Sequence, residues 1–333
     1  MSQPALAAVT GAEGFIGSHL TEALVHAGFK VRAMAQYNSF SSYGWLETLD
    51  QEVLNHVEVV LGDVRDPGSV NGLVRGADAV YHLAALIAIP YSYQAPHSYV
   101  DTNVTGTLNV LEAVRGQGIA RLVHTSTSET YGTAQTVPIT EDHPINTQSP
   151  YAASKAGGDR LADSYHASFD TPVVTLRPFN TFGPRQSMRA VIPTVIGQVA
   201  AGERTITLGD LRPTRDFLYV KDTAQAFLAA GTTAAEKVVG RTFNAGTGGE
   251  ISVGELTKLV GKLMDVDLEV REDEQRIRPA NSEVMRLVAD ATRLREATGW
   301  APAHDLEAGL LDTIAFFRDP ANLARYKTGI YNI

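Results

Sequence analysis

Short apolar runs alternate with segments of helical periodicity through the first half of the chain. The runs are ALAAVT, KVRAMA, VEVVLGD, AVYHLAA, RLVHTST and PVVTLRP, and helical patterns end near Gly28 or begin near Asn103 and Tyr151. Apolar runs of this length, separated by helices, predict strands that are buried on both faces of a parallel sheet. We therefore expect an α/β fold of the Rossmann type, with a doubly wound parallel sheet.

The pattern changes after Pro178, where turn residues and arginines become frequent in FNTFGPRQSMR and GDLRPTRDF. The later segments YVKDTAQAFLAA and RTFNAGTG again have the pattern of a helix and a strand of the first sheet. A chain of 333 residues is long enough for two packed units. We expect a Rossmann domain over residues 1–177, to which 218–248 return, and a smaller, interleaved substrate domain over 178–217 and 249–333.

Composition excludes several classes of protein. The formal charge is −9 and no long basic tract occurs, which argues against a nucleic-acid partner. The absence of cysteine excludes disulfides, thiolate metal sites and cysteine nucleophiles, and it fits a reducing compartment. The N-terminal residues lack the pattern of a signal peptide, and the most apolar run, AVYHLAALIAIP, is too short to span a bilayer. We expect a cytoplasmic protein with no membrane partner and no metal site.

Three glycines, Gly11, Gly14 and Gly17, follow the first predicted strand and lead into the first predicted helix. Glycine is needed where the backbone turns tightly and approaches a pyrophosphate, and the free N–H groups at the helix start attract the anion. This position in the chain is typical of a dinucleotide site. The alternative is a tight turn without a ligand.

The choice between NAD and NADP is less direct. An acidic residue at the end of the second strand would bind the adenosine ribose, but Ala35 stands there, followed by QYNSF. The surrounding sequence offers no arginine clamp for a 2′-phosphate beyond Arg32. We expect NAD, with Asn38 or Ser39 as the ribose ligand.

Tyr151 and Lys155 lie four residues apart in PYAASKAGG, which places them on one face of a helix. A free tyrosine titrates at roughly pH 10, too high for a base at neutral pH. A neighbouring ammonium and a positively charged nicotinamide ring would favour the phenolate and lower its pKa. The pair therefore predicts a tyrosine base.

With the glycine loop, a strand that ends in serine and threonine, and this pair, the chain resembles the extended short-chain dehydrogenase/reductase family over nearly its whole length. The resemblance implies that Thr127 hydrogen-bonds the hydroxyl being oxidised, Tyr151 takes its proton, and Lys155 holds the nicotinamide ribose. It also implies a homodimer and places Asn103 behind the site, while Ala84 and Ala85 fit either the cofactor or the plain core. We assign the cofactor to Gly11, Gly14, Phe15, Ile16, Gly17, Asp63, Val64, Ala84, Ala85, Asn103, Tyr151, Lys155 and Pro178.

Arginines recur in the loops of the second half, at Arg185, Arg215 and Arg278. Forked guanidinium groups suit a nucleoside diphosphate, and the matching positions bind it in family members that act on nucleotide sugars. Arg189 and Arg212 match less securely and fit exposed positions as well. We assign the nucleotide sugar to Pro90, Asn180, Arg185, Ile192, Arg215 and Arg278.

Ser128 and Glu129 stand in the frame TSETYG, where the nucleotide-glucose 4,6-dehydratases that the chain resembles read TDEVYG. In such enzymes C4 is oxidised, a carboxylate removes the C5 proton, the C6 hydroxyl leaves as water, and hydride returns to C6, so the nicotinamide is regenerated. Glu129 matches the C5 base. Ser128 replaces the aspartic acid, so it would orient water, relay a proton, or leave both proton transfers to Glu129.

Long stretches such as ALIAIPYSYQAPHSYVDTNVTGTLNVLEA and LGDLRPTRDFLYVKDT resemble the N-acetylhexosamine 4,6-dehydratases of legionaminic-type acid pathways, which share the serine before the glutamate. The resemblance implies 4,6-dehydration of a UDP- or GDP-linked N-acetylglucosamine by a retained NAD. A nucleotide-sugar 4-epimerase and a UDP-glucuronate decarboxylase remain alternatives, and a non-catalytic dinucleotide sensor is an alternative of another class.

Overall fold

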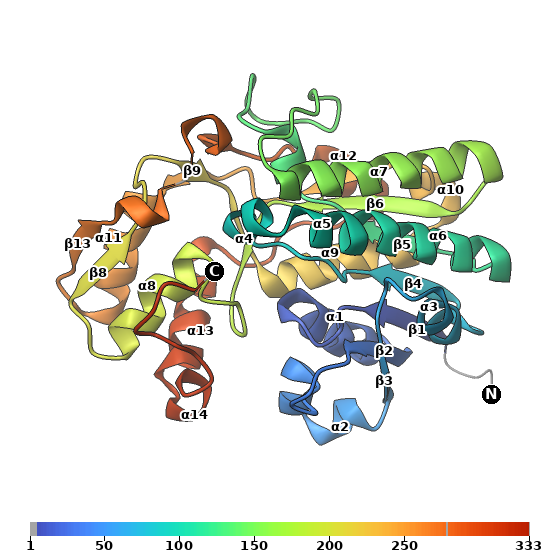
Figure 1. Ribbon diagram of the computed structural model, residues 1–333, viewed down its shortest axis with the longest axis horizontal. Coiled ribbons are helices and arrows are strands. Elements are labelled where there is room, and N and C mark those ends of the chain that lie inside the picture. The colour runs from blue at the N-terminus through green and yellow to red at the C-terminus, as the bar shows by residue number, and fades with distance from the viewer. Residues whose placement is uncertain (1–4, 278, 333) are drawn as a thin grey trace.

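The computed structural model describes residues 5–277 and 279–332 and shows two lobes (Figure 1). The larger lobe is built on a parallel seven-stranded sheet in the order β11-β6-β5-β4-β1-β2-β3, which confirms the predicted doubly wound fold. Its chain order reverses between β1 and β4, which is where such sheets bind ligands. The strands are β1 (Leu6–Thr10), β2 (Lys30–Gln36), β3 (Val57–Gly62), β4 (Ala79–His82), β5 (Leu122–Thr125), β6 (Val173–Pro178) and β11 (Thr242–Ala245).

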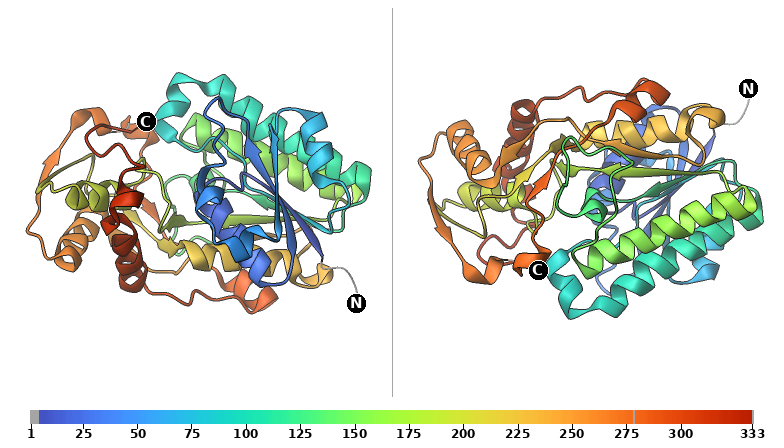
Figure 2. Two further views of the ribbon diagram at one scale, coloured as in Figure 1. Left: turned by 90° about the horizontal axis from the view of Figure 1, so that it is seen from below. Right: turned by 90° about the horizontal axis from the view of Figure 1, so that it is seen from above.

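Helices cover both faces of this sheet, and the two views of Figure 2 show α1 and α9 on one face and α6 and α7 on the other. Leu20, Leu24 and Phe227 are buried in one apolar cluster, and Val70 and Leu111 are buried in a second. The apolar stripes of the helices therefore explain why the central strands β1, β4, β5 and β6 are buried on both faces, whereas the edge strand β3 is partly exposed. The helices are α1 (Phe15–His26), α3 (Pro67–Val74), α6 (Gly106–Gln117), α7 (Pro150–Phe169) and α9 (Val220–Thr232).

The smaller lobe has its own apolar core, in which Ile196, Val260 and Phe317 are buried. Its strands form three small sheets, which pair β7 (Asn180–Phe182) with β10 (Phe217–Tyr219), β9 (Thr214–Arg215) with β12 (Ile251–Ser252) and β14 (Arg286–Leu287), and β8 (Thr205–Leu208) with β13 (Glu269–Glu272). Its helices are α8 (Val191–Ala200), α11 (Val253–Met264), α13 (Leu306–Arg318) and α14 (Pro320–Leu323).

Short elements connect these parts. In the larger lobe they are η1 (Gly44–Thr48), α2 (Gln51–Leu54), α4 (Ile89–Gln94), α5 (Pro96–Tyr99), the π-helical turn η2 (Val100–Thr105), η3 (Ser128–Tyr131) and α10 (Ala235–Val238). Near the C-terminus are η4 (Glu274–Arg276), η5 (Ala280–Ser282) and α12 (Thr292–Thr298).

The division between the lobes differs from the predicted one in a segment near the C-terminus. Residues 249–333 were expected to lie wholly in the smaller lobe, but α12 packs against α9 and β11 of the larger lobe. The apolar side chains of Leu294 and Trp300 account for this, because both are buried in the cluster around α1 and α9. No helix among the described residues has the length and apolarity needed to cross a membrane.

Candidate active site

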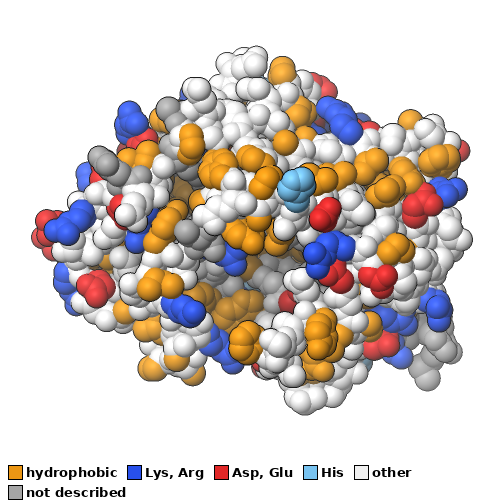
Figure 3. Space-filling model, viewed as in Figure 1, with side chains coloured by type: hydrophobic (Ala, Val, Ile, Leu, Met, Phe, Trp, Pro, Cys, Tyr) orange, Lys and Arg blue, Asp and Glu red, His pale blue; other side chains and the backbone are white. Residues whose placement is uncertain are grey.

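A cavity of about 1120 Å³ lies between the two lobes, where the carboxyl ends of β1, β4, β5 and β6 meet the smaller lobe. Figure 3 shows the hollow at the surface. Of the residues that were assigned from the sequence and that the structure describes, all but Asn103 line this cavity. Arg278 lies outside the described residues.

The glycine loop forms one wall of the cavity. Gly11 has φ +67°, and a Cβ atom there would lie 2.8 Å from the backbone nitrogen of Ala84. A Cβ atom on Gly17 would overlap the carbonyl oxygen of Gly11. Backbone atoms therefore pack against Gly11 and Gly17 so closely that neither position has room for a side chain. Helix α1 begins at Phe15, and Phe15 and Ile16 line the cavity. This cradle fits a dinucleotide pyrophosphate.

Asn103 holds the wall in place and does not reach the cavity, which corrects its assignment as a cofactor ligand. Its side-chain amide donates to the Leu86 carbonyl and to Ser154 Oγ, both at 2.9 Å, and its Oδ1 atom accepts from the Leu86 N–H at 2.9 Å. All of these groups belong to the protein, so the amide fixes the loop after β4 against α7. The residue is buried at 1% exposure.

Tyr151 and Lys155 lie one turn apart on α7, and both are buried in the cavity wall. Helix α7 begins here because Ser149 caps it and Pro150 occupies its first turn. The Lys155 ammonium donates to the carbonyl oxygen of Thr125 at 2.5 Å, and the hydroxyl of Thr127 lies beside the Tyr151 phenol.

The protein alone does not lower the pKa of Tyr151, and the expected lowering also includes the charge of a bound nicotinamide. Burial raises the pKa of the phenol; the hydrogen bond with Thr127 opposes this rise, and the charge of Glu129 adds to it. Burial also lowers the pKa of Lys155 to about 8. The expected phenolate therefore requires the positive charge of a bound oxidised nicotinamide.

Ser128 and Glu129 follow Thr127 in the short helix η3, which Thr127 caps by accepting from the Glu129 N–H at 3.3 Å. Both side chains are largely buried, at 3% and 9% exposure, and both line the cavity. Within the described part of the chain, the Glu129 carboxylate makes no hydrogen bond or ion pair. It is thus available to a substrate that also contacts Thr127 and Tyr151.

The predicted substrate residues Asn180, Ile192 and Arg215 line the cavity from the side of the smaller lobe, and Pro90 lines it from α4 of the larger lobe. The Oδ1 atom of Asn180 is buried and has no hydrogen-bond partner among residues 5–277 and 279–332. Arg215 is buried beside Glu283, at 3.3 Å. Both positions fit a polar ligand that enters between the lobes.

Arg185 lines the cavity and pairs with an acidic side chain of the larger lobe. Its guanidinium forms a forked ion pair with Glu22 of α1, with N–O distances of 2.8 and 3.1 Å. The pair joins the two lobes at the cavity edge, because residue 185 follows β7 and residue 22 lies in the larger lobe. Arg185 therefore joins the two lobes, and because it also lines the cavity its role in binding diphosphate stays a prediction.

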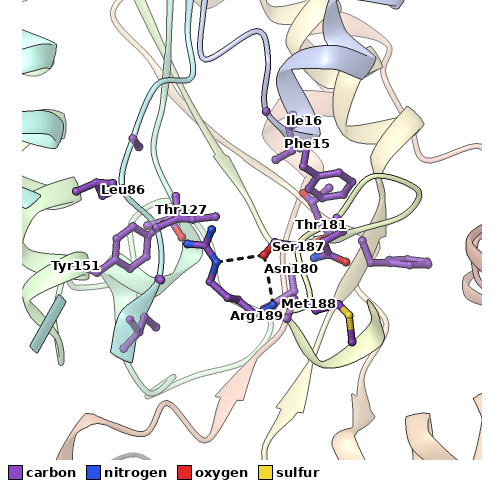
Figure 4. Close-up of a pocket in the computed structure, with 18 of the residues that line it drawn as sticks. Phe15, Ile16, Leu86, Thr127, Tyr151, Asn180, Thr181, Ser187, Met188 and Arg189 are labelled. Atoms are coloured by element: carbon purple, nitrogen blue, oxygen red, sulfur yellow. Dashed lines mark hydrogen bonds between the residues drawn. The ribbon is translucent and has the colours of Figure 1, made fainter. Parts of the chain in front are cut away.

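Cationic side chains that sequence reasoning missed or set aside also line the cavity, namely Arg189, Arg276, Arg325 and Lys327. Figure 4 shows Arg189 directed toward the side of the cavity that holds Thr127 and Tyr151, and its Nε atom donates to Ser187 Oγ at 3.1 Å. Arg276 donates to the Thr207 carbonyl at 2.9 Å. The signal for Arg276 was present in RIRP, because it stands two residues before the assigned Arg278.

A buried polar network lies behind the catalytic residues and was not predicted. Asp159 accepts from Ser126 Oγ at 2.6 Å, from His124 Nε2 at 3.1 Å and from Arg177 Nη2 at 2.9 Å. Asp159 follows Lys155 by one turn on the same face of α7, so the i, i+4 spacing could have indicated it. No three histidine, aspartate or glutamate residues within the described ranges come together as a metal site.

Comparisons with known proteins agree with this geometry. The model of the GDP-mannose 4,6-dehydratase family matches residues 8–313. The chain belongs to this family of extended short-chain dehydrogenases/reductases. Its similarity to the relatives below extends over nearly the whole length of both chains.

Named relatives include both epimerases and dehydratases. A UDP-glucose 4-epimerase of Mycolicibacterium smegmatis is 34% identical, over 93% of this chain and 98% of the relative. A dTDP-glucose 4,6-dehydratase of Xanthomonas campestris is 33% identical, over 93% and 92%. The structure of a dTDP-glucose 4,6-dehydratase from Streptomyces venezuelae, with NAD and TYD bound, is 28% identical and has a TM-score of 0.87, over 97% of this chain and 99% of the other. The chain is therefore a member of a nucleotide-sugar 4,6-dehydratase and epimerase family.

Proposed function

We propose that the protein is an NAD-dependent 4,6-dehydratase of a nucleotide-activated N-acetylhexosamine, with UDP- or GDP-N-acetylglucosamine as the substrate class. The observation that carries this proposal is the Glu129 carboxylate, which lines the same cavity as Thr127 and Tyr151 and has no partner among the described residues. The similarity to a dTDP-glucose 4,6-dehydratase supports the reaction class. The sequence resemblance to N-acetylhexosamine dehydratases supports the sugar.

The cofactor would be held by the glycine loop, by the wall formed by Val64, Ala84 and Ala85, and by Lys155. NAD, when bound, accepts a hydride from C4 of the sugar and returns it to C6 later in the cycle. The chain supplies the proton chemistry at C4. Thr127 holds the C4 hydroxyl, and the phenolate of Tyr151 takes its proton as the alcohol becomes a ketone.

The ketone makes the C5 proton acidic, and Glu129 is the carboxylate that removes it. The C6–O bond then breaks and the hydroxyl leaves as water with a proton from the same carboxyl group. The hydride that a bound cofactor would return adds to C6, and C5 takes up a proton equivalent to the one that Tyr151 removed from the C4 hydroxyl, so one water is lost and no net oxidation occurs. Ser128 orients the C6 hydroxyl beside Glu129, because its own hydroxyl is a poor acid at neutral pH.

A 4-epimerase is the second candidate, because one relative carries that name at 34% identity. Epimerisation at C4 needs Tyr151 and Thr127 but gives a carboxylate at position 129 nothing to do. A UDP-glucuronate decarboxylase would pass through the same ketone and release carbon dioxide. The three reactions differ in the mass of the product.

The test is to incubate the purified protein, without added reductant, with UDP-N-acetylglucosamine, GDP-N-acetylglucosamine and UDP-glucuronate, and to measure products by mass spectrometry. We expect a product lighter by the mass of one water from an N-acetylglucosamine nucleotide. Glu129→Gln is the matched variant and should form none. A product of unchanged mass, or carbon dioxide from the glucuronate, would replace the proposal with the corresponding alternative.

A further inference from the structure

The carboxylate of Glu13, in the middle of the glycine loop, reaches the end of β2. Its Oε1 atom accepts from the Gln36 N–H at 3.1 Å, and Gln36 is the last residue of that strand. Its Oε2 atom is buried and has no hydrogen-bond partner within the described part of the chain. Both residues line the cavity. No acidic residue stands at the end of β2, where Ala35 and Gln36 lie. The structure places the Glu13 carboxylate of the glycine loop beside that strand end instead.

The backbone of Glu13 is held from outside the loop by the start of η1. The Trp45 N–H donates to the Glu13 carbonyl at 2.9 Å. Gly44 has φ +58°, and a Cβ atom there would lie 2.6 Å from the same carbonyl oxygen. The Gly-Trp pair in SSYGWLETL therefore packs directly on the glycine loop and fixes the position from which the Glu13 side chain extends.

The side chain of Asn38, predicted for the adenosine ribose, is engaged elsewhere. The amide of Asn38 donates to the carbonyls of Gln36 and Ser42, and its Oδ1 atom accepts from the N–H groups of Phe40 and Ser42. Asn38 thus closes its own loop, and neither it nor Ser39 lines the cavity.

Arg32, the one cation considered for a 2′-phosphate, is also engaged. Its guanidinium donates to Glu58 at 2.8 Å and to the carbonyls of Leu73 and Arg75. Arg65 lines the cavity but is paired with Asp63 at 2.5 Å. Both guanidinium groups are therefore already paired within the protein. A 2′-phosphate would contact the Glu13 carboxylate and gain no unengaged cation from Arg32 or Arg65.

We propose that Glu13 binds the 2′- and 3′-hydroxyls of the adenosine ribose and makes the protein selective for NAD over NADP. The unpaired Oε2 atom can accept hydrogen bonds from the ribose hydroxyls. A buried acceptor without a partner costs free energy, so pairing it with a hydroxyl contributes to NAD binding. A 2′-phosphate would place like charges in contact and is rejected. This inference rests on the proposed use of NAD.

The test measures dissociation constants of NAD and NADP by calorimetry with cofactor-free protein. We expect the wild type to bind NAD at least about a hundredfold more tightly than NADP. Glu13→Gln should weaken NAD binding about tenfold and bring the dissociation constants of NAD and NADP closer together, because the negative charge is lost. Glu13→Asp keeps the charge but not the reach, so it should weaken NAD while NADP stays disfavoured.

Glu52→Gln, at an exposed position in α2, is the control for the loss of one negative charge and should leave both constants unchanged. Thermal unfolding of each variant shows whether the glycine loop is intact. If Glu13→Gln is folded and keeps the wild-type ratio of the two constants, the inference is wrong. If the wild type binds neither dinucleotide, the proposed function fails instead, and the two failures are distinguished.

Discussion

The hydroxyl of Ser126 donates to the carboxylate of Asp159 over 2.6 Å, and this bond joins the strand end that carries Thr127 to the helix that carries Tyr151. The two catalytic groups come from elements that are separated in sequence. Their relative position therefore depends on a buried carboxylate whose hydrogen bonds go to Ser126, His124 and Arg177 and not to Thr127 or Tyr151. Asp159 is a positioning residue in this account.

Asp159→Asn should destabilise the protein by about 3–5 kcal/mol at neutral pH, because it leaves the buried guanidinium of Arg177 without its charge partner. The free energy of unfolding from urea titration measures this loss. Asp163→Asn, an exposed position on the same helix, is the control and should change the free energy by less than about 0.5 kcal/mol. Equal values for wild type and Asp159→Asn would remove the network from the account.

The contribution of Asp159 should depend on pH. Burial alone would raise its pKa, but the hydrogen bond from His124 and the charge of Arg177 lower it to about 2, below the ordinary value of 3.8. A depressed carboxyl pKa stabilises the fold above the ordinary value, and this stability is lost as pH falls toward the folded value. The stability difference between wild type and Asp159→Asn should therefore be constant near neutrality and shrink as pH falls from about 4 to about 2.

Lys155 should give the opposite dependence, at alkaline pH. Burial lowers the pKa of its ammonium to about 8, from an ordinary value of 10.5. Between these two values the unfolded chain binds more protons than the folded one, so stability rises with pH. The wild type should gain stability relative to Lys155→Met over this interval in urea titrations. Lys258→Met, at an exposed position, is the control. If the difference in free energy of unfolding between the wild type and Lys155→Met does not change with pH, the Lys155 amine is not buried as described.

Gly17→Ala should damage the glycine loop. Its methyl group would overlap the carbonyl oxygen of Gly11, so the backbone must shift, at a cost of about 1–3 kcal/mol. Calorimetry should also show weaker NAD binding. Gly72→Ala in α3, where no atom lies within 4 Å of the added methyl, should leave NAD binding unchanged and stabilise the helix by up to about 1 kcal/mol. Identical behaviour of the two variants would contradict the close packing of the loop.

Arg189→Met should weaken the binding of UDP or GDP by about tenfold, because the guanidinium that enters the cavity is lost. Arg204→Met removes an exposed guanidinium from the same lobe and should have no effect. Calorimetry with the nucleoside diphosphate alone is the measurement. If both variants bind as the wild type does, the diphosphate lies elsewhere in the cavity.

The sequence predicted the layers of the fold better than it predicted the contacts between lobes. Strand and helix patterns depend on local burial, and they correctly identified the sheet and the return of α9 and β11 to it. The glycine spacing similarly located the loop after β1, where two Cβ positions are closed by backbone. The strand pattern, the helix pattern and the glycine spacing can each be recognised from residues that are close together in the sequence.

The partners of charged side chains were harder to predict, because they are set by packing across the cavity. Arg185 pairs with Glu22, 163 positions away, and nothing local distinguishes it from a diphosphate ligand. Glu13 reaches Gln36 through the fold of the glycine loop, while the local candidate Asn38 turns back on its own loop. Arg189 is exposed, as considered from the sequence, and it also lines the cavity. Each difference has the same cause: tertiary contact decides where a flexible side chain ends.

The most direct test of the central proposal is a single-turnover experiment with Glu129→Gln, NAD and the nucleotide sugar that the wild type converts. Absorbance should show reduced nicotinamide that accumulates and persists, because C4 is oxidised but the C5 proton is not removed, and mass spectrometry should detect no dehydrated sugar. Tyr151→Phe, as the paired control, should show neither signal. Dehydrated product from Glu129→Gln at the wild-type rate would show that another group is the base and would contradict the account.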